Sequence, residues 1–253
     1  TRLCSSAASD VYKRQKEALT FDDVTLAPNY SEILPSEVKT DVKLSKYLSI
    51  SIPLLTSAMD TVTESNMAIS IAKNGGIGVI HRNLTIDEQI REIRKVKAKK
   101  MLVAAAVGAS KNEQLRAQKI LKENLDLIVV DTAHGHTKKV KEIIKKINKN
   151  KNKKTLLCAG NIATAEAANF LANLGVDIVK VGIGPGSICT TRLVAGIGVP
   201  QLSAIINVKK GLKNKKIKII ADGGIKFSGD IAKALAAGAD AVMIGSLFAG
   251  SIE

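Results

Sequence analysis

Residues 155–181 read TLLCAGNIATAEAANFLANLGVDIVKV and contain the unit that decides the fold. Two short apolar runs, Thr155–Ala159 and Ile178–Val181, flank a stretch that we expect to be a helix ending at Gly175. Glycine is favoured just after a helix because it adopts the left-handed conformation at little cost. Near-continuous apolar runs of this length are typical of strands buried on both faces of a parallel sheet. The segment therefore predicts a strand–helix–strand unit.

The same alternation extends along the chain in both directions. Six further apolar runs predict strands, namely Ile52–Ser57, Ile77–His81, Leu102–Val107, Leu127–Asp131, Ile217–Ala221 and Ala241–Gly245. Helix signals lie between them, including capping boxes that begin at Thr85 and Ser110. One helix shows an apolar stripe at helical spacing, made of Val140, Ile143, Ile144 and Ile147.

Eight strands separated by seven helical segments predict an α/β fold, a single (β/α)8 TIM barrel over residues 16–253. We expect its C-terminal part to be truncated, because the eighth helix has barely begun at Glu253. An open doubly wound sheet is the alternative, but no Gly-x-Gly-x-x-Gly turn opens an early helix. Residues 1–15 are small and polar without periodicity, and we expect a disordered or artefactual tail there.

Bulk composition limits the kinds of partner. No stretch approaches the roughly 20 apolar residues of a membrane helix. Three scattered cysteines do not form a disulfide framework, so we expect a cytoplasmic protein. The net charge of +15 would suit nucleic acid, but the lysines cluster beside predicted helices and only 3% of residues are aromatic. We interpret the basic runs as solvated helix faces and do not expect a nucleic-acid partner.

The loop after the sixth predicted strand, residues 182–192, reads GIGPGSICTTR. Glycines let the backbone approach a ligand closely, and inward carbonyls of such a loop can hold a monovalent cation. Cys189 lies among hydroxyl groups and near Arg192, where the reactive thiolate is favoured, so we predict a nucleophile. Cys158, in contrast, lies in an apolar run and is predicted to be a buried core thiol.

Polar residues and glycines also follow other strands. Asp222 precedes a glycine pair after the seventh strand, and Gly245 and Ser246 follow the eighth. Loops at these two positions bind phosphate in many barrels, while an aspartate can accept hydrogen bonds from ribose hydroxyls. A phosphorylated nucleoside satisfies both features.

Asp131 ends the fourth predicted strand and is followed closely by His134 and His136. A metal site is one interpretation, but such a site needs three or four ligands and no further cluster supplies them. We favour Asp131 as an acceptor for ribose hydroxyls, as in dinucleotide sites. We expect Asn161, at the end of the fifth strand, to contact the same ligand.

Taken together, these motifs resemble the IMP dehydrogenase / GMP reductase family, and the resemblance covers nearly everything after Leu19. Residues 184–192, GPGSICTTR, are similar to the family's signature loop. Residues 193–201, LVAGIGVPQ, are closer to the dehydrogenases than to the reductases. So are residues 221–226, ADGGIK, and residues 21–26, FDDVTL.

The resemblance implies an NAD-dependent oxidoreductase that converts IMP to XMP in guanine nucleotide synthesis. Cys189 would attack carbon 2 of the purine, hydride would pass to NAD, and a covalent thioimidate would remain. Water positioned with the help of Thr191 would then release XMP. A thiolate is suited both to this addition and to its later departure.

The resemblance also implies ligand sets and an assembly. The IMP site would comprise Ser57, Met59, Ser187, Asp222, Gly224, Gly245 and Ser246. The cofactor site for NAD would comprise Asp131, Thr132, Ala133, Asn161 and Gly182. A K+ ion would be bound by the backbone carbonyls of Gly184, Gly186 and Cys189. The family forms homotetramers, so we expect one here.

The sequence departs from the family pattern at two places. Arg94–Lys97 runs almost directly into Met101–Val103, so we expect no regulatory CBS modules between them. The family's flap, with the arginine and tyrosine that activate water, should follow Glu253, and we expect this chain to form the adduct but to release product slowly. Two alternatives stay open: a GMP reductase that uses the same cysteine and releases ammonia, and a non-catalytic barrel that binds nucleotide or nucleic acid through its basic surface.

Overall fold

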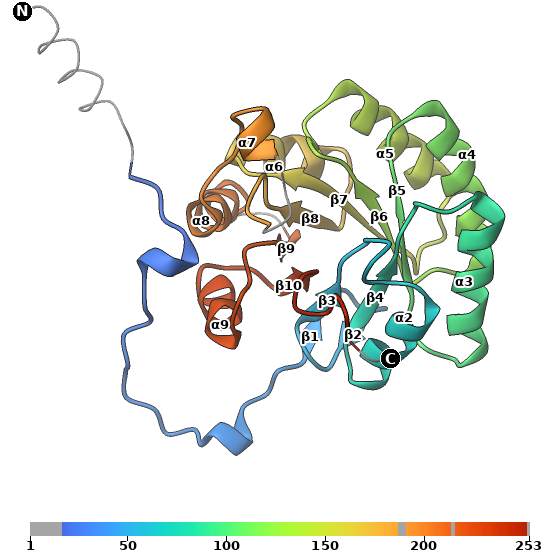
Figure 1. The fold of residues 1–253 in the computed structure, drawn as a ribbon. Coiled ribbons are helices and arrows are strands. Elements are labelled where there is room, and N and C mark those ends of the chain that lie inside the picture. The colour runs from blue at the N-terminus through green and yellow to red at the C-terminus, as the bar shows by residue number, and fades with distance from the viewer. Residues whose placement is uncertain (1–16, 187–190, 214–215, 252–253) are drawn as a thin grey trace, which may run out of the picture.

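The computed structural model describes residues 17–186, 191–213 and 216–251, and a closed barrel of eight parallel strands forms its centre (Figure 1). The strands follow the order β10-β3-β4-β5-β6-β7-β8-β9 around the barrel. Their bounds are β3 Leu54–Thr56, β4 Ile77–Ile80, β5 Ala104–Val107, β6 Leu127–Asp131, β7 Leu156–Ile162, β8 Ile178–Val181, β9 Lys218–Asp222 and β10 Ala241–Ile244. The predicted TIM barrel and its eight strands are confirmed. The predicted tail, residues 1–15, lies outside the described residues.

Helices join successive strands and pack around the outside of the barrel (Figure 1). Their bounds are α2 Ser65–Lys73, α3 Ile86–Ala98, α4 Lys111–Ile120, α5 Lys138–Asn150, α6 Ala165–Asn173, α7 Thr191–Val194, α8 Gln201–Gly211 and α9 Ser228–Ala236. The predicted stripe of α5 is buried against the strands, as its helical spacing requires. None of the described helices combines the length and apolar character needed to cross a membrane.

The two predicted capping boxes differ in the structure. Thr85 forms the full box at the start of α3. Ser110 accepts a hydrogen bond from the Glu113 N–H at 3.4 Å, but the Glu113 carboxylate does not return to Ser110. It accepts instead from the Gly108 N–H at 2.5 Å and from Arg116 at 2.9 Å. The prediction of a full capping box at Ser110 is therefore wrong, because the buried Arg116 requires the Glu113 carboxylate as its counter-charge.

A short hairpin closes one end of the barrel. Its strands are β1 Val42–Lys43 and β2 Ser49–Ile50. Leu44, Leu48 and Ile50 are buried in one cluster with the apolar side chains of the barrel interior. The hairpin lies beside the residues at the starts of β8 and β9. The C-terminal ends of the strands therefore form the open mouth, where barrels carry their sites.

Aspartates at the opposite end from the mouth join the strands in pairs. Each aspartate directly precedes one strand and pairs with a residue in or next to the preceding strand. Its carboxylate accepts a hydrogen bond from the backbone N–H of that partner, and its own backbone N–H donates to the carbonyl of the same partner. The pairs are Asp126 with Val103, Asp177 with Leu157 and Asp240 with Ile219, at 2.8–3.1 Å. Each carboxylate also contacts a lysine, respectively Lys97, Lys151 and Lys218. We call these three arrangements the aspartate clasps.

Candidate active site

A cavity opens at the mouth, between the ends of β3, β9 and β10 and the loop after β8. It is lined by six of the seven residues predicted for IMP, namely Ser57, Met59, Asp222, Gly224, Gly245 and Ser246. Ser187, the seventh, lies outside the described residues. Pro185 and Gly186 form the facing wall. The barrel thus brings residues from distant parts of the sequence into one site.

Glycine at position 245 keeps the cavity open. A Cβ on Gly245 would lie 2.8 Å from the Met59 Sδ and 3.4 Å from the Ser57 Oγ. The Ser57 N–H donates to the Ile244 carbonyl at 2.9 Å, which fixes the end of β3 beside the end of β10. Any side chain at residue 245 would therefore enter the space between Met59 and Ser57.

Beside this cavity, one buried lysine contacts two carboxylates. The Lys180 Nζ lies 2.8 Å from the Asp131 Oδ1 and also donates to the Asp222 Oδ2. It donates a third hydrogen bond to the Asn161 Oδ1. The Lys180 side chain is only 3% exposed. Four strands, β6 to β9, therefore share one polar cluster at the mouth.

The charges in this cluster stabilise one another. The attraction of the Lys180 ammonium holds the pKa of Asp131 below its ordinary value, against the opposing effect of burial. Although burial disfavours the ammonium, the attraction of Asp131 and Asp222 raises the pKa of Lys180. The lysine therefore stays charged, and Asp131 stays ionised, at neutral pH.

The residues predicted for NAD lie around the same cluster. The Asn161 amide donates to the Gly182 carbonyl at 2.7 Å and to Asp222 at 2.9 Å. The Thr132 hydroxyl donates to the Gly160 carbonyl at 2.7 Å, and the Thr132 carbonyl accepts from the Asn161 N–H at 2.8 Å. These contacts join the ends of β6, β7 and β8.

Ala133, the fifth residue predicted for NAD, is exposed in the loop that follows Thr132. Lys180 was not among the predicted site residues, although it lies inside an otherwise apolar strand. That exception in residues 178–181, IVKV, was the available signal.

Of the two cysteines given roles in the sequence analysis, Cys189 and Cys158, the structure describes only Cys158. Cys189 lies outside the described residues. Cys158 is fully buried inside the barrel, and burial raises the pKa of its thiol to about 12. The prediction of a buried core thiol at residue 158 is therefore confirmed.

The loop predicted for K+ is described on both sides of Cys189. Gly184 has φ +78°, and a Cβ there would lie 2.6 Å from the Arg192 Cγ. The Arg192 Nη2 donates to the Val199 carbonyl at 2.9 Å, so its side chain spans the segments before and after the cysteine. Thr191 is partly buried at the start of α7. The Arg192 side chain therefore links Gly184 to Val199, although residues 192–198 are exposed.

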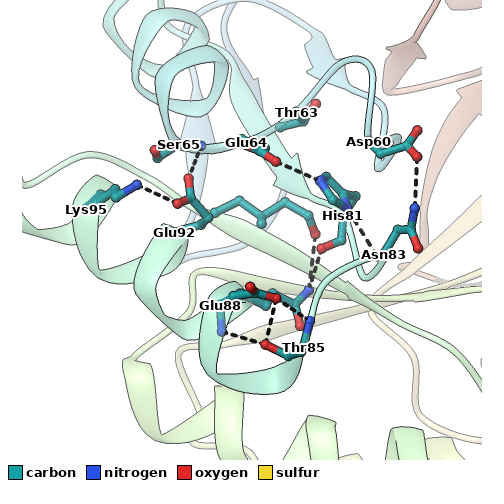
Figure 2. Close-up of polar contacts among 12 residues, drawn as sticks. Asp60, Thr63, Glu64, Ser65, His81, Asn83, Thr85, Glu88, Glu92 and Lys95 are labelled. Carbon is teal, nitrogen blue, oxygen red and sulfur yellow. Dashed lines mark hydrogen bonds and ion pairs between the residues drawn. The ribbon is translucent and has the colours of Figure 1, made fainter.

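A second polar cluster supports the loop that carries Met59 (Figure 2). His81 is buried; its Nε2 lies 3.4 Å from the Glu64 Oε1 and its Nδ1 accepts from the Asn83 N–H at 3.1 Å. The Asn83 side chain donates to Asp60 at 2.9 Å. Because the Nδ1 is an acceptor, the Nε2 is the ring nitrogen that can donate a hydrogen bond to Glu64. The cluster ties the loop after β3 to the loop after β4.

Comparison with known proteins gives the family. The family model described as "IMP dehydrogenase / GMP reductase domain" matches residues 18–253. A protein of Borreliella burgdorferi named inosine-5'-monophosphate dehydrogenase is 47% identical over 291 residues, which cover 95% of this chain and 72% of that protein. Proteins with the same name from Cryptosporidium parvum and Staphylococcus aureus are 42% and 37% identical, covering 94% and 95% of this chain and 69% and 75% of their own lengths. The chain belongs to the IMP dehydrogenase / GMP reductase family.

Proposed function

We propose that this chain oxidises IMP to XMP with NAD as the hydride acceptor, in guanine nucleotide synthesis, and that Cys189 is the nucleophile. The cavity at the barrel mouth is the observation that carries the proposal. It gathers six residues that the family resemblance assigns to IMP. Its wall continues to Gly186, three positions before Cys189 in the sequence.

The cavity suits a phosphorylated nucleoside. Asp222 lies on one side and can accept hydrogen bonds from ribose hydroxyls, because an ionised carboxylate has about four acceptor positions. Gly224, Gly245 and Ser246 offer backbone amides and a hydroxyl to a phosphate group. Met59 provides an apolar surface for the base.

Asp131 and Asn161 suit the nicotinamide riboside of NAD. The Asp131 side chain is 32% exposed at the mouth and ionised by its contact with Lys180, so it can accept from ribose hydroxyls. Asn161 is fixed by its contacts to Gly182 and Asp222. NAD supplies the hydride acceptor when it is bound. The chain's own residues hold the two ribose groups on either side of Lys180.

In the proposed reaction the Cys189 thiolate forms a bond to carbon 2 of the purine, and that carbon then gives up hydride. The resulting thioimidate is attacked by water, the thiolate leaves, and XMP is released. Cys158 cannot take this role, because it is buried and protonated. Thr191 would position the water.

The loop chemistry also suits K+. Backbone carbonyls are the oxygen ligands that K+ accepts in proteins. The carbonyls of Gly184, Gly186 and Cys189 would bind the ion, which would order the loop. The close approach of the Arg192 side chain to Gly184, together with its hydrogen bond to the Val199 carbonyl, supports a defined backbone there.

We also propose the remaining properties of the family pattern. The chain would act as a cytoplasmic homotetramer, and residues 16–253 would form one barrel domain. Only residues 99–103 separate α3 from β5, which supports the absence of a CBS pair at that point.

The test uses the purified chain with IMP and NAD, followed by NADH absorbance and by intact-protein mass. We expect NADH and a nucleotide adduct, and we expect Cys189→Ala to abolish both. Cys158→Ala is the matched control and should retain both. Ammonia release from GMP and reduced nicotinamide, without oxidation of IMP, would support the reductase. IMP binding without adduct or NADH would support the non-catalytic barrel.

A further inference from the structure

At the mouth of the barrel, the negative Asp131 on β6 and the positive Lys180 on β8 are separated by one strand, β7. The strand register pairs Asp131 with Gly160, and Gly160 with Lys180. A Cβ on Gly160 would lie 2.7 Å from the Lys180 Cβ and 2.5 Å from its carbonyl oxygen. Because residue 160 has no side chain, Lys180 can reach across β7 to the carboxylate on β6.

The Lys180 ammonium has three N–H donors, and each donates to one oxygen. The three acceptor oxygens are the Asp131 Oδ1, the Asp222 Oδ2 and the Asn161 Oδ1. Asp131 and Asp222 belong to β6 and β9, which are not neighbours in the barrel. One buried cation is thus shared by two carboxylates, and salt screens such a buried contact little.

We infer that Lys180 is a positioning residue that couples the cofactor-facing Asp131 to the nucleotide-facing Asp222. The inference rests on the proposed function, which assigns these aspartates to the two ribose sites. If Asp131 loses its charge, its attraction for the Lys180 ammonium weakens and the ammonium moves toward Asp222. It then competes with the ribose hydroxyls of IMP for the lone pairs of that carboxylate. A change on the cofactor side therefore weakens nucleotide binding without touching the nucleotide.

The chain offers a matched control at the opposite end of the barrel. The Lys218 Nζ contacts the Asp240 Oδ1 at 2.7 Å in one of the aspartate clasps. Lys218 and Lys180 are both strand residues paired with aspartate, but Lys218 lies at the start of β9, away from the mouth. Lys218→Met removes the same charge as Lys180→Met and leaves the two ribose sites intact.

The experiment measures IMP binding to the full chain by calorimetry without NAD, with a thermal unfolding curve for every variant. We expect Lys180→Met to weaken IMP binding about tenfold or more, because Asp222 loses the contact that positions its carboxylate at the cavity. Lys180→Arg keeps the charge and should recover most of this loss, and Lys218→Met should bind IMP as the wild type does. Asp131→Asn retains Lys180 and should weaken IMP binding about threefold or more.

The outcomes separate this inference from the proposed function. A wild-type chain that binds no IMP overturns both. A wild type that binds IMP, with a folded Lys180→Met variant whose affinity is within about twofold of it, overturns the coupling alone. If Lys180 has only a structural role, Lys180→Met should keep its affinity for IMP and unfold at a lower temperature than the wild type. If Lys180→Met does not fold, Asp131→Asn decides, and an unchanged affinity for IMP in that variant overturns the coupling.

Discussion

Replacing Gly182 with alanine should strongly destabilise the barrel at its mouth. Gly182 has φ +152°, and a Cβ there would lie 2.0 Å from the Asp222 carbonyl oxygen. Carbon and oxygen approach to about 3.3 Å even in close contacts, so the ends of β8 and β9 would have to separate by about 1 Å. Overpacking of this kind costs about 1–3 kcal/mol, and the unfavourable backbone conformation adds about 1–3 kcal/mol.

The expected loss is therefore about 4 kcal/mol, or a fall of about 8–16 °C in Tm for a domain of this size. Gly229→Ala is the matched control, because a Cβ at residue 229 meets nothing within 4 Å. Gly229 lies in α9, where alanine is favoured over glycine by up to about 1 kcal/mol, so its Tm should rise slightly. Thermal unfolding followed by circular dichroism measures both variants. A Gly182→Ala variant that unfolds within about 2 °C of the wild type would refute the close approach of β8 and β9.

Three further predictions follow from the buried groups and the cavity. Iodoacetamide should modify Cys158 only after unfolding, and because the pKa of its thiol is raised from 9.0 to about 12, the stability that this burial provides is complete below pH 9 and is lost as the pH rises toward 12. The free energy of unfolding of Cys158→Ala should therefore fall less than that of the wild type between pH 9 and pH 12. An equal fall in the two proteins would contradict the prediction. Arg116→Met leaves a buried carboxylate without its counter-charge and should cost about 3 kcal/mol in urea unfolding, whereas Arg94→Met, which breaks a more exposed pair, should cost less than about 1 kcal/mol. Gly245→Ala should weaken IMP binding about tenfold with little change in Tm, because its Cβ enters the cavity beside Met59; unchanged affinity would show that IMP does not use this space.

The strands of the barrel could be predicted because they are buried on both faces. β6 and β8 begin and end at the predicted residues, Leu127–Asp131 and Ile178–Val181. The hairpin of β1 and β2 was missed, because two residues per strand leave no apolar run to detect. The reciprocal cap at Ser110 failed for a different reason, since the buried Arg116, one turn further along α4, competes for the same glutamate.

The cavity could be predicted in large part because barrel topology gathers the C-terminal ends of all strands at one mouth. Local motifs such as the glycines after β9 and β10 therefore indicated residues that line one space. The role of Lys180 could not be predicted in this way. Its acceptors lie on β6, β7 and β9, and only the closed barrel brings them within hydrogen-bond distance.

The aspartate clasps carry a consequence for the order of folding. Each clasp links a strand to the next one along the chain, and Asp126 is only 23 residues from its partner Val103. Contacts of short sequence separation form early, because they close small loops at low entropic cost. We expect the strand pairs β5–β6, β7–β8 and β9–β10 to assemble first as independent building blocks. The pairing of β10 with β3, which are far apart in the sequence, would then form last and close the barrel.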